Sequence, residues 1–148
     1  MRIKYLCFSE RKTTGGGEMK EIPVGESFEK EGRVTEDLAT FHFSGGEVGV
    51  LSTPKLIDFI EFTCIDFLEK FCDEGENSVG TRVDVRHLAP TPIGMSFRVK
   101  VTTKEVEGRR VLFQVEGYDE KDKIVEGVHE RFVIRVDKFI ETIKKKGE

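Results

Sequence analysis

The chain has 148 residues, of which 37% are hydrophobic and 35% are charged. This balance suits one folded domain with a hydrophobic core and argues against a disordered protein. No apolar run approaches the roughly 20 residues that span a bilayer, so no membrane partner is expected. The net charge is −4 and the basic residues form no single stripe, so nucleic acid is not expected as a partner either.

Composition also bears on the cellular setting. The three cysteines lack the spacing of metal ligands, and the basic N-terminus lacks the continuous apolar segment of a signal peptide. Both features indicate a cytoplasmic, reduced protein. Asn77 and Gln114 are the only side-chain amides, whereas Lys and Glu are abundant. Few thermolabile amides and many charged residues are typical of a thermophile's protein.

Residues 1–20 differ in composition from the rest of the chain. Three glycines at positions 15–17 and Glu18 precede Met19, and codons for Gly-Gly-Gly-Glu can encode a purine-rich ribosome-binding sequence. We therefore expect residues 1–20 to be an N-terminal extension and hypothesise that translation naturally begins at Met19. A mass spectrum in which the native protein has the mass of a chain that starts at Met1 would contradict this hypothesis. Residues 21–148 are expected to form a single domain.

The first elements of that domain are short. Residues 28–34 alternate loosely between polar and apolar side chains, which predicts a first strand. Residues 37–46 show no regular period and predict a loop. Phe41 and Phe43 are expected to be exposed in that loop, where the pair could line a pocket.

Residues 53–71 predict one long helix, with Thr53 as its N-cap and Pro54 at its first position. At about 100° per residue, one half of the circumference is apolar. Glu61 is the exception, because it falls inside the apolar arc. An unpaired carboxylate there would cost several kcal/mol, so Glu61 is expected either to pair with an Arg or His that stabilises the core or to serve in chemistry.

Four strands are expected after this helix. They are residues 79–88, 95–102, 110–118 and 124–136, the last with a bulge near Gly127, followed by a short helix over residues 137–146 capped by Asp137. A helix that is apolar over half its circumference must be covered by the sheet. The pattern therefore predicts an α+β fold in which a curved antiparallel sheet wraps one long central helix.

Two further side chains are expected near Glu61. Alternation in residues 79–88 puts five side chains on one face, which is expected to turn toward the helix: Val79, Thr81, Val83, Val85 and His87. Glu61 and His87 would form an acid/base couple in which the carboxylate raises the pKa of the imidazole. Thr53 would add a hydroxyl at the helix N-terminus, where backbone N–H groups favour an anion. Taken singly, Thr53 is equally explained as a helix cap and His87 as a structural histidine.

Alternation in the last strand gives the opposite expectation for two other residues. His129 and Arg131 share a mostly polar face with Val133 and Arg135, so that face is predicted to be exposed to solvent. Only a dimer interface or the bulge at Gly127 would turn Arg131 toward a site.

The order of these motifs resembles the fluoroacetyl-CoA thioesterase-like family of hot-dog folds. The resemblance covers about residues 52–139 and rests on four segments: LSTPKLIDFIEFTC at 51–64, GTRVDVRHLAPTPIGM at 80–95, VEGRR at 106–110 and EGVHERFVI at 126–134. It implies a homodimeric hot-dog acyl-CoA thioesterase. The family's catalytic threonine, glutamate and histidine match Thr53, Glu61 and His87. Its glycine and arginine beside the acyl group match Gly80 and Arg131.

The resemblance departs from the family pattern at one place. The fluoroacetate-specific enzyme carries lid phenylalanines before the threonine, but residues 46–50 read GEVGV and hold no aromatic. Selectivity for fluoroacetyl is therefore not expected.

Sequence and resemblance together predict an acyl-CoA thioesterase that releases a free acid and coenzyme A without a cofactor or metal. The mechanism is open at this stage: Glu61 is nucleophile or general base, Thr53 attacks or orients, and His87 stabilises charge or carries the proton. One alternative is an acyl-CoA hydratase or dehydratase on the same fold. Another is a non-catalytic dimer that binds acyl-CoA.

Overall fold

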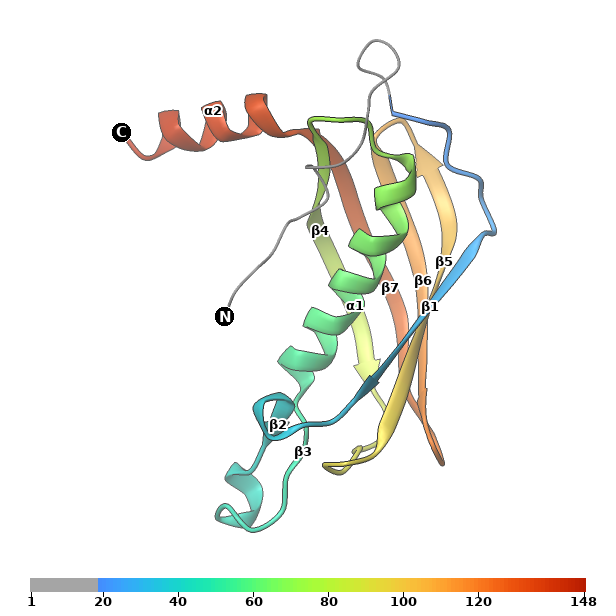
Figure 1. The fold of residues 1–148 in the computed structure, drawn as a ribbon, viewed down its shortest axis with the longest axis vertical. Coiled ribbons are helices and arrows are strands. Elements are labelled where there is room, and N and C mark those ends of the chain that lie inside the picture. The colour runs from blue at the N-terminus through green and yellow to red at the C-terminus, as the bar shows by residue number, and fades with distance from the viewer. Residues whose placement is uncertain (1–18) are drawn as a thin grey trace.

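The computed structural model describes residues 19–148, so residues 1–18 of the predicted extension lie outside the described part. Five antiparallel strands form the main sheet, in the order β1-β5-β6-β7-β4. They are β1 (Ser27–Arg33), β4 (Glu76–His87), β5 (Ser96–Glu107), β6 (Arg110–Asp119) and β7 (Lys123–Arg135). The sheet curves around the long helix α1 (Thr53–Leu68), as Figure 1 shows. The predicted α+β fold of one helix wrapped by a curved sheet is confirmed.

Short elements join β1 to α1. They are the 3₁₀ turns Glu36–Leu38 and His42–Ser44 and the paired two-residue strands β2 (Ala39–Thr40) and β3 (Val50–Leu51). Another 3₁₀ turn, Glu69–Phe71, extends α1 to the predicted end at Phe71. No helix among residues 19–148 is long and apolar enough to cross a membrane.

The start of α1 differs from the prediction by one residue. Ser52, not Thr53, is the N-cap, and its side chain accepts a hydrogen bond from the Lys55 backbone N–H at 3.2 Å. Pro54 occupies the first turn as expected, because its missing N–H would have no partner inside the helix. The cap is therefore supplied by Ser52, and the Thr53 hydroxyl is available for another contact.

The core forms where the apolar arc of α1 meets β5 and β6. Leu56, Ile60 and Phe67 are almost fully buried, as are Val101 and Phe113 on the facing strands. The rings of Phe67 and Phe113 meet edge to face, with centroids 5.6 Å apart. Burial of each such side chain stabilises the fold by about 1.5–3 kcal/mol, which fixes the helix on the sheet.

A β-bulge changes the face of β4 in mid-strand. Gly80 pairs with Arg131 and Arg82 pairs with Glu130, so Thr81 is the extra residue. Before the bulge Ser78 and Gly80 share the helix side of the sheet; after it the odd-numbered residues do, His87 among them. The sequence prediction was right for His87 but wrong in placing Val79 and Thr81 on the same face, because one inserted residue reverses the alternation.

The predicted exposure of His129 and Arg131 is wrong. The side chains of His129 and Arg131 are 0% and 2% exposed, and Val133 on the same face is fully buried. The register shift between β6 and β7 lies opposite Gly117 and Tyr118 rather than at Gly127. Polar side chains thus occupy part of the inner face of β7, and they can do so because they bond to one another.

Helix α2 (Val136–Lys146) follows β7 directly and points away from the body of the fold (Figure 1). Its N-cap residue is Arg135, so Asp137 lies in the first turn instead of capping the helix as predicted. Three lysines in its last turn suit the negative end of the helix dipole.

Candidate active site

The N-terminus of α1 and the end of β4 bring Thr53 and His87 into contact. Thr53 Oγ1 lies 2.8 Å from His87 Nδ1, which is hydrogen-bonding distance. The contact exists because Ser52 serves as the helix cap and because the Thr81 bulge turns His87 to the helix side. The structure therefore joins two of the three residues that the sequence singled out.

A pocket of about 350 Å³ opens at this pair. Its walls come from the loop before α1 and from the end of β4, and they are mostly apolar: Thr40, His42, Phe43, Val50, Leu51, Thr53, His87, Leu88, Ala89 and Pro90. Phe43 is 57% exposed and lines the pocket as expected. Phe41 does not; its ring lies against Gly49, where an added Cβ would come within 2.5 Å of it.

Burial lowers the pKa of His87 below its ordinary value of 6.5. This result contradicts the expectation that a neighbouring carboxylate would raise it. The ring is therefore neutral at pH 7, and a neutral imidazole can accept a proton. Nε2 of His87 is buried and has no hydrogen-bond partner among residues 19–148.

Glu61 lies in a second polar cluster farther along α1. One of its carboxylate oxygens is 3.2 Å from Nη1 of Arg131. The Glu61 side chain is 36% exposed whereas that of Arg131 is 2% exposed, so the carboxylate reaches the surface and the guanidinium does not. Glu61 thus has an Arg partner, which was one of the two expectations for it; the other was a role in chemistry.

Arg131 is fixed from two further sides. Its Nε donates to Ser78 Oγ at 2.8 Å and its Nη2 to the Ser78 carbonyl at 2.9 Å, while Nη1 also lies 3.1 Å from His129 Nε2. The sequence analysis named neither Ser78 nor His129 as site residues. The one sequence feature that could have indicated them is strand alternation, because residues two apart share a face. Ser78 is two residues before Gly80, and His129 is two residues before Arg131.

Gly80 leaves room for the Glu61 carboxylate. A Cβ at this position would come within 2.9 Å of Glu61 Oε2 and 3.4 Å of Arg131 Nη1. The glycine is required for close approach of the carboxylate to the strand rather than for a special backbone angle.

The two clusters do not touch within one protomer. Glu61 is eight residues after Thr53 on the same helix, an axial separation of about 12 Å. No hydrogen bond among the described residues joins Glu61 to Thr53 or His87. The expected Glu61–His87 couple is therefore not formed inside a single subunit.

Other sites in the described part of the chain lack comparable chemistry. A cavity of about 450 Å³ is lined mostly by charged side chains of β4, β5, β6 and β7, and it contains none of the predicted site residues. No three His, Cys, Asp or Glu side chains in residues 19–148 gather closely enough to hold a metal ion.

A helix wrapped by an antiparallel sheet, with a Thr–His pair and a Glu–Arg pair beside the edge strand, defines a hot-dog thioesterase. The family model described as fluoroacetyl-CoA-specific thioesterase matches residues 34–137. The chain belongs to this family, and its activity is the hydrolysis of an acyl-CoA thioester to a free acid and coenzyme A. A curated relative, the fluoroacetyl-CoA thioesterase of Streptantibioticus cattleyicolor, is 35% identical over 66% of this chain and 70% of its own.

Solved structures agree with the assignment. A structure of the fluoroacetyl-CoA thioesterase FlK superposes with a TM-score of 0.79 at 30% identity, covering 86% of this chain and 98% of its own. A thioesterase superfamily member from Thermus thermophilus also gives a TM-score of 0.79 at 30% identity, over 87% and 96% of the two chains. A hot-dog-like protein from Thermanaerovibrio acidaminovorans gives 0.77 at 26% identity, over 84% and 92%.

Proposed function

We propose that the thioester is cleaved at a site shared by two subunits, with Thr53 and His87 from one and Glu61 from the other. The observation that carries this proposal is the 2.8 Å contact between Thr53 Oγ1 and His87 Nδ1, about 12 Å along the helix from Glu61. One subunit cannot bring all three groups to one carbonyl carbon, whereas a symmetric dimer can.

The unpaired edge of β4 supports the dimer. β4 ends the sheet, and Val83, on the helix side of this strand, is 39% exposed. A long strand edge with free backbone groups favours pairing with a second copy. Antiparallel pairing about an axis at Asp84, with Thr81 again the extra residue, would set His87 opposite the partner's Gly80, and Gly80 lies against Glu61. The homodimer would therefore complete the site.

In the proposed mechanism Thr53 is the nucleophile. Neutral His87 accepts the Thr53 proton as Oγ1 attacks the carbonyl carbon, and the C–S bond breaks as coenzyme A leaves with the proton returned by His87. Glu61 of the partner subunit then takes a proton from the water that attacks the acyl-threonine. The C–O bond to Thr53 breaks, the Thr53 oxygen takes that proton back from Glu61, and the acid is released. No cofactor or metal enters these steps, and the proposed setting is the cytoplasm.

The pocket suggests a short acyl group. Phe43, Val50 and Leu88 give its wall apolar character, and its volume is about 350 Å³. The relatives' substrate is fluoroacetyl-CoA by name, but residues 46–50 of this chain contain no aromatic side chain. We therefore expect acetyl-CoA and fluoroacetyl-CoA to be hydrolysed with kcat/KM values within about tenfold of each other, which corresponds to about 1.4 kcal/mol.

Thiol release from a series of acyl-CoA chain lengths tests the substrate. Release that is fastest for two to four carbons supports the proposal, whereas fastest release for long chains contradicts it. Tight binding without any release would favour the non-catalytic dimer. Acid quenching during turnover, followed by mass spectrometry, should find the acyl group on Thr53; an acyl group on Glu61 would overturn the assignment of nucleophile.

Subunit mixing tests the shared site. Thr53→Ala and Glu61→Gln subunits are each expected to be inactive alone, with turnover lowered by about 10²–10⁴-fold. Co-expressed, half of the dimers are mixed and each mixed dimer has one intact site, so about 25% of wild-type activity should return. Thr53→Ala mixed with His87→Ala is the matched control and should restore nothing, because both residues belong to the same half-site. Absence of recovery in the first mixture would contradict the shared site.

A further inference from the structure

His129 occupies a place that the mechanism above leaves unused. It lies on the inner face of β7, fully buried, two residues before Arg131. Its Nε2 is 3.1 Å from Arg131 Nη1, and its Nδ1 is 2.8 Å from the Arg82 backbone carbonyl on β4. Each ring nitrogen therefore has a partner whose role as hydrogen-bond donor or acceptor is fixed.

Those partners fix the protonation state of the ring. A guanidinium has only N–H donors, so Nε2 of His129 must be unprotonated to accept from Arg131. The Arg82 carbonyl is only an acceptor, so Nδ1 must carry the proton. One tautomer satisfies both contacts: the neutral ring with hydrogen on Nδ1. An imidazolium would point an N–H at the buried guanidinium and lose the bond.

The surroundings favour the same state. Burial lowers the pKa of His129 below 6.5; the Arg82 carbonyl acts in the opposite direction and the charge of Arg131 lowers the pKa further. Glu61 and Glu130 are the nearby carboxylates and favour the protonated ring. Burial is the largest of these effects, so the ring is neutral at pH 7.

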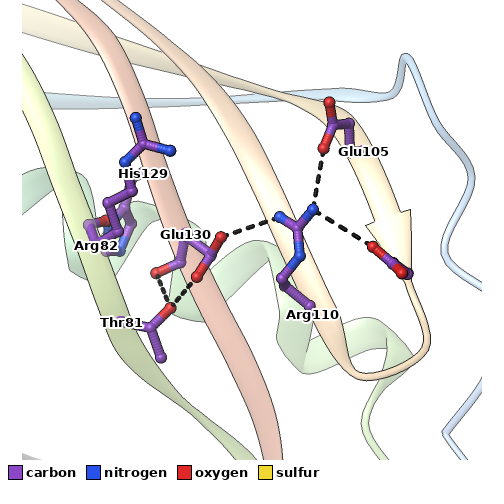
Figure 2. A network of polar contacts seen from close by, with 7 residues as sticks. Thr81, Arg82, Glu105, Arg110, His129 and Glu130 are labelled. Atoms are coloured by element: carbon purple, nitrogen blue, oxygen red, sulfur yellow. Dashed lines mark hydrogen bonds and ion pairs between the residues drawn. The ribbon is translucent and has the colours of Figure 1, made fainter.

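The bulge at Thr81 supplies the carbonyl that sets the tautomer. Thr81 is the extra residue in β4, and Arg82 follows it directly. Thr81 Oγ1 donates to Glu130 Oε1 at 2.8 Å, and Arg110 Nη1 donates to Glu130 Oε2 at 2.9 Å. Figure 2 shows this chain of contacts with Arg82 beside His129. The network thus holds the bulge, and through it the acceptor for Nδ1.

We infer that His129 is a positioning residue: in its neutral Nδ1–H tautomer it accepts a hydrogen bond from Arg131 and so orients the guanidinium that holds Glu61. This inference rests on the proposed catalytic role of Glu61. Arg131 Nη1 is shared by Glu61 and His129, so loss of the acceptor at 129 frees the guanidinium to tilt and carry the carboxylate with it. Ser78 holds the other end of Arg131, so the effect falls on the Nη1 side.

The tautomer is tested on the wild-type protein by ¹⁵N NMR of the imidazole nitrogens. The chain has three histidines, so His129→Gln assigns the signal. We expect His129 Nε2 to give the shift of an unprotonated nitrogen and Nδ1 that of a protonated one at pH 7. A protonated Nε2 would overturn the inference. This measurement requires no activity, so it stands apart from the test of Glu61.

Kinetics of two substitutions test the consequence. His129→Gln keeps an oxygen that can accept from Arg131, whereas His129→Leu fills the space without an acceptor. We expect His129→Leu to lower kcat for a short acyl-CoA by about ten- to hundredfold with KM little changed, and His129→Gln to restore most of that loss. Equal losses in both variants, with both folded by circular dichroism, would contradict the positioning role. If Glu61→Gln proves fully active, the proposed function fails even when the NMR result holds.

Discussion

At the scale of single residues, the division of labour between Ser52 and Thr53 decides the chemistry of the helix start. Ser52 caps α1 through its side chain, while Thr53 Oγ1 is 2.8 Å from His87 Nδ1. Adjacent hydroxyls thus have separable roles, one in stability and one in the reaction.

Substitution of each hydroxyl separates the two roles. Ser52→Ala is expected to lower the free energy of unfolding by about 1 kcal/mol and to leave turnover near the wild-type value. Thr53→Ala is expected to lower turnover by about 10²–10⁴-fold. Its loss in the free energy of unfolding should be less than half that of Ser52→Ala, because no cap is removed. Urea denaturation and thiol release measure the two effects. If the Ser52→Ala variant is inactive and the Thr53→Ala variant is active, the assignment of the two roles is wrong.

One half-buried and one buried histidine predict how the free energy of unfolding depends on pH. Burial lowers the pKa of both His87 and His129 below 6.5. Just below that pH the unfolded chain binds more protons than the folded one, so the free energy of unfolding is at its full value above about pH 6.5 and declines as the pH falls through the folded pKa values. Denaturation at pH 7.5 and pH 5 should show the decline, and His129→Gln should reduce it.

The lowered pKa of His87 also predicts how activity depends on pH. Neutral His87 is the proposed proton acceptor, so kcat/KM of the free enzyme should fall only at pH values below 6.5. A loss of activity centred above pH 6.5 would contradict a His87 whose pKa is lowered.

At the scale of elements, the Thr81 bulge lets both halves of strand β4 place a functional residue on the helix side of the sheet. Gly80 before the bulge lies against Glu61, and His87 after it reaches Thr53. Without the extra residue, one of these two would face away from α1. A single irregularity in one strand therefore serves both polar clusters.

Gly80→Ala is the sharpest change in this element. The new Cβ would come within 2.9 Å of Glu61 Oε2, and the flexible carboxylate would move to relieve the contact. Because Gly80 is exposed and has no left-handed backbone angle, the free energy of unfolding should change by less than about 1 kcal/mol. Turnover should fall at least about tenfold. Wild-type turnover in this variant would show that catalysis does not depend on the position of the Glu61 carboxylate.

At the scale of the whole molecule, the exposed edge of β4 and the separation of the two clusters both favour a dimer. The composition adds a second expectation, since side-chain amides are few and Lys and Glu abundant. We expect a homodimer at micromolar concentration and an unfolding midpoint above the roughly 45–65 °C of mesophile domains. Light scattering and calorimetry measure these. A monomeric mass would exclude the shared site, while a midpoint inside that range would remove only the inference of a thermophilic source.

The sequence by itself determined the helix, the strands after it and the family. Helical and strand periods are local properties, so the arc of α1 and the alternation in β5 and β6 could be read directly. The same periods identified Glu61 as a misplaced carboxylate, and the resemblance supplied Thr53, His87, Gly80 and Arg131. The activity followed from that resemblance, and the comparisons confirm it.

Only the tertiary structure decided which polar groups meet. The bulge at Thr81 depends on pairing between β4 and β7, residues that are far apart in sequence, so strict alternation misassigned Val79 and Thr81. In the sequence, His129 and Arg131 look like solvent-facing residues because they lie on a mostly polar face. In the structure, their burial is stabilised by partners on other elements: Ser78, the Arg82 carbonyl and Glu61. Such contacts have no period along the chain, and for that physical reason the sequence could not show them.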